Sequence, residues 1–186
     1  DNGATWTTPA TYPIYTASPP TGFCGYANDD GDEVPHLGTA EGVWQYDANG
    51  DNPNLVVDLR QQVNVDNCRG MATWGQTGCL YIPVATHPLG QCIEYRVQGG
   101  VRILRQVGLD LGSGLPANRQ SVLISLRPAG RWLFGLLRNT TTFVCQVFAF
   151  DGAAWHHIYN SNTSSGDYSN AGGLQPCPQV LCIARD

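Results

Sequence analysis

Short apolar segments alternate with turn residues along most of the chain, and their period is that of β-strands. Residues 92–97 give the clearest example, because every second side chain there is Ile, Tyr or Val. A Gly-Gly pair at 99–100 then predicts a tight hairpin turn into a second strand over residues 101–107. The pattern therefore predicts antiparallel pairing between neighbouring segments.

Similar segments recur every eight to twelve residues, separated by Pro, Gly, Asn and Asp. This spacing is typical of all-β sandwiches and barrels. We therefore expect an all-β fold, a single-domain antiparallel β-sandwich or barrel of about eight to ten strands with long loops. The strands are expected near residues 43–46, 79–85, 92–97, 101–107, 121–127, 131–138, 142–150 and 155–159.

Residues 54–63 are compatible with either a helix or a strand. Leu55, Leu59 and Val63 have helical spacing, whereas the adjacent Val56 and Val57 favour a strand because β-branched side chains restrict χ1 in helices. Both interpretations are kept at this point.

The whole chain, residues 1–186, is expected to be one β domain. Residues 1–40 are rich in Thr, Pro, Gly and Asp and show little periodicity, so we expect a loop-rich wrap with short edge strands there. Residues 41–186 are expected to supply the core strands, with no linker between two domains.

Charge is scarce and unevenly distributed. Charged residues make up 13% of the chain, all ten cationic residues are Arg, and the net charge is −5. Residues 1–66 hold ten acids and one Arg (−9), and residues 67–186 hold five acids and nine Arg (+4). This balance argues against nucleic acid as a partner. The chain contains no apolar run near 18 residues, so we expect no membrane insertion.

The cysteine and glycosylation patterns favour an extracellular location. None of the seven Cys forms a C-x-x-C pair, which argues against a zinc ribbon. The odd number leaves at least one thiol free or paired with another chain. Asn139 and Asn162 begin N-x-S/T triplets and are candidate glycosylation sites if the protein is secreted.

One segment has the spacing of a calcium loop. Between residues 47 and 58, side-chain oxygens fall at positions 1, 3, 5 and 12, on Asp47, Asn49, Asp51 and Asp58. This segment resembles the calcium loops of dockerin modules, but Asn52 stands where a glycine is usual. A solvated turn between strands is the alternative, so Ca²⁺ is the only cofactor that the sequence suggests.

Aromatic residues are the candidate ligand contacts. Trp44 and Tyr46 flank the acidic loop and lie two residues apart, so in a strand they would share a face. Trp74 follows a segment of loop character. Exposed Trp and Tyr beside Asn, Asp and Gly loops suit stacking on sugar rings or contact with a protein, whereas the alternative is a place in the core.

Catalytic patterns are scarce, and we expect a protein that is not an enzyme. The chain lacks the G-x-S-x-G frame and both phosphate-binding glycine motifs. A His and a carboxylate brought together only by the fold, with His87 or His156 in a cleft, would instead indicate a small secreted hydrolase.

Residues 131–137 (RWLFGLL) followed by residues 142–148 (TFVCQVF) resemble segments of the capsid spike domains of astroviruses, in particular the avian ones. The resemblance rests on size and strand-rich character across the chain. It implies a homodimer on the surface of a non-enveloped virion that engages a host-cell receptor, either a glycan or a protein. It transfers no individual receptor-binding residue.

A secreted calcium-dependent carbohydrate-binding or adhesin domain is the main alternative. In it the loop from Asp47 to Asp58 would hold Ca²⁺, and Trp44 and Tyr46 would stack on sugar. Loss of binding in a chelator would favour this alternative.

Overall fold

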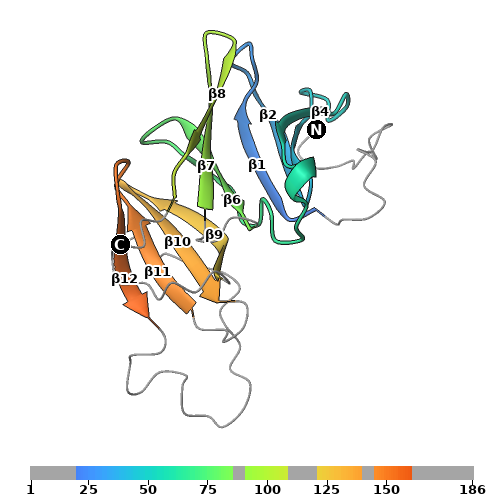
Figure 1. Cartoon of the computed structure of the whole chain (residues 1–186). Coiled ribbons are helices and arrows are strands. Elements are labelled where there is room, and N and C mark those ends of the chain that lie inside the picture. The colour runs from blue at the N-terminus through green and yellow to red at the C-terminus, as the bar shows by residue number, and fades with distance from the viewer. Residues whose placement is uncertain (1–19, 86–90, 109–120, 140–144, 161–186) are drawn as a thin grey trace, which may run out of the picture.

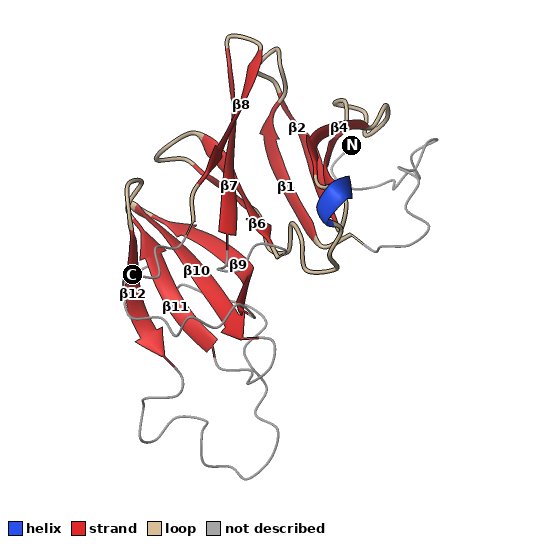
Figure 2. Cartoon of the chain, in the orientation of Figure 1, coloured by secondary structure: helices blue, strands red, loops and turns tan. Residues whose placement is uncertain are grey.

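The computed structural model describes residues 20–85, 91–108, 121–139 and 145–160. These residues form three four-stranded antiparallel sheets and one short 3-10 helix, η1 (Figures 1 and 2). The first sheet contains β1 (Gly22–Ala27), β2 (Glu33–Thr39), β3 (Gly42–Gln45) and β4 (Asn54–Asp58). The middle sheet contains β5 (Ala72–Trp74), β6 (Cys79–Val84), β7 (Gln91–Gln98) and β8 (Val101–Gln106). The third sheet contains β9 (Ser121–Ala129), β10 (Trp132–Asn139), β11 (Cys145–Phe150) and β12 (Trp155–Asn160), and η1 is Arg60–Gln62.

The all-β, sandwich-like fold expected from the sequence is confirmed. In each sheet, strands that follow one another in the sequence are neighbours and pair antiparallel. The sheets are open, so the barrel alternative is wrong, and the described residues hold twelve strands rather than eight to ten. The strands beyond the eight expected positions are β1, β2, β4 and β5, of which β4 and β5 are short and β1 contains two glycines.

Within the N-terminal segment that was expected to be a loop-rich wrap with short edge strands, residues 22–39 form the β1–β2 hairpin, and β1 is an edge strand of the first sheet. Gly22 and Gly38 lower the β-propensity of these strands, but the packing requires them. A Cβ on Gly38 would lie 2.5 Å from the Cβ of Cys68, and one on Gly22 would lie 2.2 Å from the Cys68 carbonyl oxygen. Glycine here lets another backbone approach the sheet closely.

Residues 54–63 form a strand followed by one turn of 3-10 helix, so the helical interpretation is wrong for most of the segment. Trp44 pairs with Leu55 and Val43 pairs with Val57, which leaves Val56 as the extra residue of a β-bulge. Both Val56 and Val57 are buried. The Val pair that opposed helix in the sequence is therefore the bulge itself.

The middle sheet is covered on both faces, which explains why β6 is apolar at every position. Cys79 and Tyr81 pack towards the third sheet, while Leu80, Ile82 and Val84 pack towards the first sheet. A strand buried on both sides reads as a continuous apolar run rather than an alternating one. The fold thus has three layers with two cores between them.

The hairpin predicted at residues 99–100 is confirmed. Gln98 pairs with Val101, and both Gly99 (φ 59°) and Gly100 (φ 76°) adopt the left-handed conformation of a two-residue β-turn. The β7–β8 and β1–β2 turns lie side by side at one end of the molecule (Figure 1). There, Arg102 of β8 forms a bidentate ion pair with Asp29 in the β1–β2 turn, at 2.9 and 2.8 Å. This ion pair joins the first and middle sheets.

A buried asparagine organises the segment between η1 and β5. The Asn67 amide nitrogen donates to the carbonyls of Ala40 (2.9 Å) and Gln62 (2.8 Å), and its side-chain oxygen accepts from the Ala85 amide (2.9 Å). The Thr21 hydroxyl donates to the backbone carbonyl of Asn67 at 2.6 Å. One side chain therefore connects the first sheet, the loop and the end of β6.

Among the described cysteines, Cys24, Cys68, Cys79 and Cys92 are free thiols. Cys145 is in a disulfide bond, and its partner lies outside the described residues. Burial raises the pKa of Cys68 to about 12 and that of Cys24 to about 11. Within the described part of the chain, no helix is long and apolar enough to cross a membrane.

Candidate binding face on the first sheet

The outer face of the first sheet carries an apolar row that crosses all four strands. Phe23 of β1 pairs with Leu37 of β2, Leu37 pairs with Trp44 of β3, and Trp44 pairs with Leu55 of β4. Alternate residues such as Tyr26, Val34 and Val43 are buried against the middle sheet, so this row lies on the opposite face. We call Phe23, Leu37, Trp44 and Leu55 the outer row.

The outer row is only partly covered. The Phe23 side chain is 68% exposed, and the other three members are half-buried. A sheet with one face in the core normally presents polar side chains on the other, so an apolar row here requires an explanation.

Acidic residues border the outer row. Glu33 lies on the same face of β2, and its carboxylate reaches over Gly25, because a Cβ on Gly25 would lie 2.2 Å from Glu33 Oε1. Asp30 and Asp32 are exposed in the β1–β2 turn. The face is therefore apolar at its centre and negative at one end.

The three aromatic residues predicted to contact ligand have different environments. Trp44 belongs to the outer row, whereas Tyr46 is 7% exposed. Trp74 is 1% exposed, makes tilted ring contacts with Tyr81 and Phe150, and donates its indole N–H to the Gly130 carbonyl at 3.1 Å. Trp74 and Tyr46 are thus core residues in this structure, and only Trp44 remains a candidate contact.

The oxygens of the expected calcium loop are not brought together. Asn54 pairs with Gln45 beside the turn, while Asp58 pairs with Gly42 four residues further along β4, about 13 Å away at the strand rise per residue. Asp47 Oδ1 accepts the backbone N–H groups of Asn49 (2.9 Å) and Asp51 (2.8 Å). The loop is therefore a turn closed by its own first side chain.

Local hydrogen bonds explain the electrostatics of this hairpin. Hydrogen bonds from backbone N–H groups, first that of Asp51, lower the pKa of Asp47, and its Oδ2 accepts from the Asn52 amide at 2.7 Å. Arg60 lowers the pKa of Asp58 to about 2 through a bidentate contact at 3.0 and 2.6 Å. Asn52 has the left-handed backbone conformation (φ 51°) that its position in the turn requires. The described residues contain no cluster of three His, Cys, Asp or Glu that could hold a metal ion.

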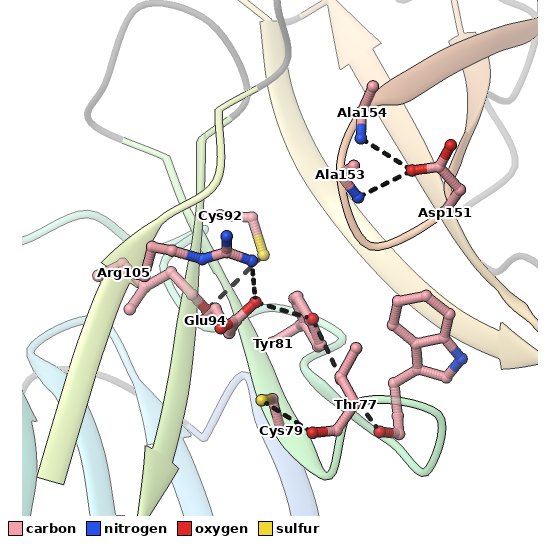
Figure 3. Close-up of polar contacts among 11 residues, drawn as sticks. Thr77, Cys79, Tyr81, Cys92, Glu94, Arg105, Asp151, Ala153 and Ala154 are labelled. Carbon is pink, nitrogen blue, oxygen red and sulfur yellow. Dashed lines mark hydrogen bonds and ion pairs between the residues drawn. The ribbon is translucent and has the colours of Figure 1, made fainter.

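A second polar cluster lies between the middle and third sheets (Figure 3). Glu94 is 6% exposed, and its Oε2 accepts hydrogen bonds from Tyr81 (2.9 Å) and Arg105 (2.5 Å). The Tyr81 hydroxyl also lies 3.2 Å from the Thr77 hydroxyl. Burial is the main cause of the raised pKa of Tyr81, and we interpret the cluster as a paired internal charge that joins β6, β7 and β8.

The two adjacent histidines of β12 lie on opposite faces, as strand alternation predicts. His156 contacts Trp132 at a ring distance of 5.7 Å, whereas His157 contacts Phe148 at 5.0 Å. Both are exposed. His156 Nε2 lies 2.9 Å from Asp151 Oδ2, and backbone N–H groups, first that of Ala154, together with His156 lower the pKa of Asp151.

The remaining predicted positions are less informative. Asn139 ends β10, and His87 and Asn162 lie outside the described residues. Sequence reasoning missed Phe23 and Leu37 because it expected a loop-rich wrap with short edge strands over residues 1–40. It missed Leu55 because residues 54–63 were compatible with either a helix or a strand. The alternation of residues 22–27 and 33–39 was the signal that could have found two of them.

Comparison of the chain with protein-family models found no match, and neither did comparison with curated proteins or with solved structures.

Proposed function

We propose that this chain is an attachment domain that binds a protein receptor on a host-cell surface through the outer row of the first sheet. The observation that carries the proposal is the continuous apolar row on a face that is not part of either core. Apolar patches that are central and rimmed by polar groups are typical of protein interfaces. The domain would act outside the cell, on a virion of the kind that astrovirus spikes decorate.

The composition of the face favours a protein over an anionic glycan. Two of its four members are leucines, which offer methyl groups rather than ring faces for stacking on sugars. Glu33 and the neighbouring acids repel sialylated or sulfated sugars. A complementary partner has an apolar centre and a basic rim, because opposite charges across an interface accelerate encounter and exclude wrong partners.

A homodimer is part of the proposal, since closed two-fold assemblies present two identical faces and increase avidity. Multi-angle light scattering of the purified chain, with and without reductant, tests this. We expect twice the mass of one chain in both conditions. A monomer would contradict the dimer, and a dimer lost on reduction would indicate an intermolecular disulfide instead of a packed interface.

The binding experiment uses fluorescently labelled protein and a panel of cultured avian and mammalian epithelial cells, measured by flow cytometry. The cells are untreated, treated with trypsin, or treated with a mixture of glycosidases. We expect saturable binding to at least one cell type that trypsin removes and glycosidases leave. Labelled serum albumin is the control for non-specific adsorption.

Binding no stronger than that of albumin on every cell type would contradict the attachment function. Binding that resists trypsin and disappears with glycosidases would contradict the choice of a protein receptor and indicate a glycan.

A further inference from the structure

A cleft of about 540 Å³ opens between the first and middle sheets, away from the outer row. Its apolar lining comes from Leu59, Val84, Ile93 and Leu104. Its polar lining consists of Asp58, Gln61, Gln62, Arg105 and Gln106. The volume is in the range of ligand-binding sites in proteins, and the apolar floor with a polar rim is their usual composition.

The charges at the cleft are neutralised within the protein. Asp58 is held by Arg60 through two contacts, and Arg105 is held by the buried Glu94. No excess charge of either sign is left to attract an ion. The best occupant is therefore uncharged and offers both hydrogen-bond donors and acceptors to the glutamine side chains.

One wall of the cleft is an edge strand. β8 is the last strand of the middle sheet, and only β7 pairs with it among the described residues. The Val107 N–H donates to the Cys92 carbonyl at 2.7 Å. Because alternate residues of a strand bond to opposite sides, the backbone groups of Leu104 and Gln106 point away from β7.

The side chains of β8 at the cleft are exposed, and one of them, Leu104, is apolar. Leu104 is 53% exposed, and it pairs with Tyr95, whose ring is in the core between the first and middle sheets. Leu104 therefore faces the first sheet, across from η1. A strand added beside β8 would point alternate side chains into the cleft in the same way.

We propose that the cleft beside β8 binds an extended, uncharged peptide segment, which pairs with β8 as a fifth strand of the middle sheet. The backbone groups of Leu104 and Gln106 supply the hydrogen bonds, and the apolar floor selects an aliphatic side chain on the peptide. This site is separate from the outer row and does not depend on the proposed attachment function.

A phage-displayed library of random heptapeptides tests the proposal with the full chain as target. Leu104→Glu puts a charge at the cleft on an exposed side chain, so the fold is retained. Val101→Glu is the matched control, because Val101 is 59% exposed on the same strand but does not line the cleft. We expect enriched peptides without charged residues, whose synthetic forms bind wild type and Val101→Glu equally and bind Leu104→Glu at least tenfold more weakly.

Two further readouts separate strand addition from adhesion to an apolar surface. In ¹H–¹⁵N spectra, the peptide should shift the amides of Arg102, Leu104 and Gln106 most strongly. N-methylation of one alternating set of peptide amides should abolish binding, and methylation of the other set should not. Absence of enriched peptides, enrichment of charged ones, equal binding to both variants, or tolerance of both methylation patterns would overturn the proposal.

Discussion

Asn67 and His36 show how single buried polar side chains determine the stability of this fold. Both are fully buried, at 0% exposure. The side-chain amide of Asn67 forms three hydrogen bonds with backbone groups, whereas His36 has, among the described residues, one hydrogen-bond partner, the Val34 carbonyl, 3.1 Å from Nδ1. Its Nε2 has no hydrogen-bond partner among the described residues. The two residues therefore respond to different perturbations.

Replacement of Asn67 by Ala should destabilise the protein by about 3 kcal/mol. The variant removes three hydrogen bonds, one buried and two partly buried, and each such bond is worth about 0.5–1.5 kcal/mol. Asn49→Ala, at an exposed turn position, is the control and should change stability by less than about 0.5 kcal/mol. Urea unfolding followed by tryptophan fluorescence measures both, and equal midpoints would contradict the role of Asn67.

His36 should make the protein less stable in mild acid. Burial is the main cause that lowers its pKa below the ordinary 6.5, and Arg102 lowers it further. The His36 ring contacts those of Tyr26 and Tyr95, which also contact each other. Below pH 6.5 the unfolded chain binds a proton that the folded chain excludes, so the free energy of unfolding falls as pH falls, by at most about 1.4 kcal/mol per pH unit. Above pH 6.5 this contribution is constant.

Urea unfolding of wild type and His36→Phe between pH 8 and 5 measures this effect. We expect the wild-type stability to decline below pH 6.5 and the variant to decline less steeply. The pKa of Asp47 is lowered, and that of Asp58 is lowered to about 2. These two carboxyl groups therefore titrate below the pH range of this experiment. Parallel curves for the two proteins would show that His36 is not responsible.

At the scale of elements, the close contact between β2 and the loop at Cys68 is the least tolerant feature of the first sheet. Cys68 is fully buried and has the left-handed conformation (φ 59°), which is unusual for a residue with a side chain. Gly38 leaves the space that the Cys68 side chain occupies. The loop thus fits the sheet only with glycine in β2.

Gly38→Ala should therefore destabilise the protein by about 1–3 kcal/mol, because the new methyl group overpacks against Cys68. Gly75→Ala is the matched control, since a Cβ on Gly75 meets nothing within 4 Å. In the double variant Gly38→Ala, Cys68→Gly, part of the loss should be recovered, because Gly removes the clash and accepts a positive φ. Thermal unfolding of the four proteins tests this, and a double variant less stable than Gly38→Ala alone would contradict it.

At the scale of the whole molecule, the sequence predicted strands better than layers. Alternation and Gly-Gly turn chemistry identified β7 and β8, because a tight two-residue turn joins the two strands. The continuous apolar run from Cys79 to Val84 contained the information for a middle layer, yet it does not say which sheets cover it. That arrangement depends on contacts between residues far apart in the chain.

The candidate face was predictable only in part. Trp44 was selected for its residue type and for its place beside an acidic loop, and it does belong to the outer row. Trp74 had the same residue type but fills a core, because burial depends on the register of β5 and β6 rather than on local sequence. Phe23 became a candidate only when pairing with Leu37 placed it in line with Trp44.

The most direct test of the attachment face compares cell binding of Phe23→Glu with that of Val65→Glu. The two wild-type side chains are almost equally exposed, at 68% and 70%, but Val65 lies in the loop after η1 and outside the outer row. A charge at Phe23 would have to be desolvated when the outer row is buried in the interface. We predict that Phe23→Glu lowers the apparent affinity for cells at least tenfold while Val65→Glu binds like wild type, and equal binding by both folded variants would contradict the outer row as the attachment face.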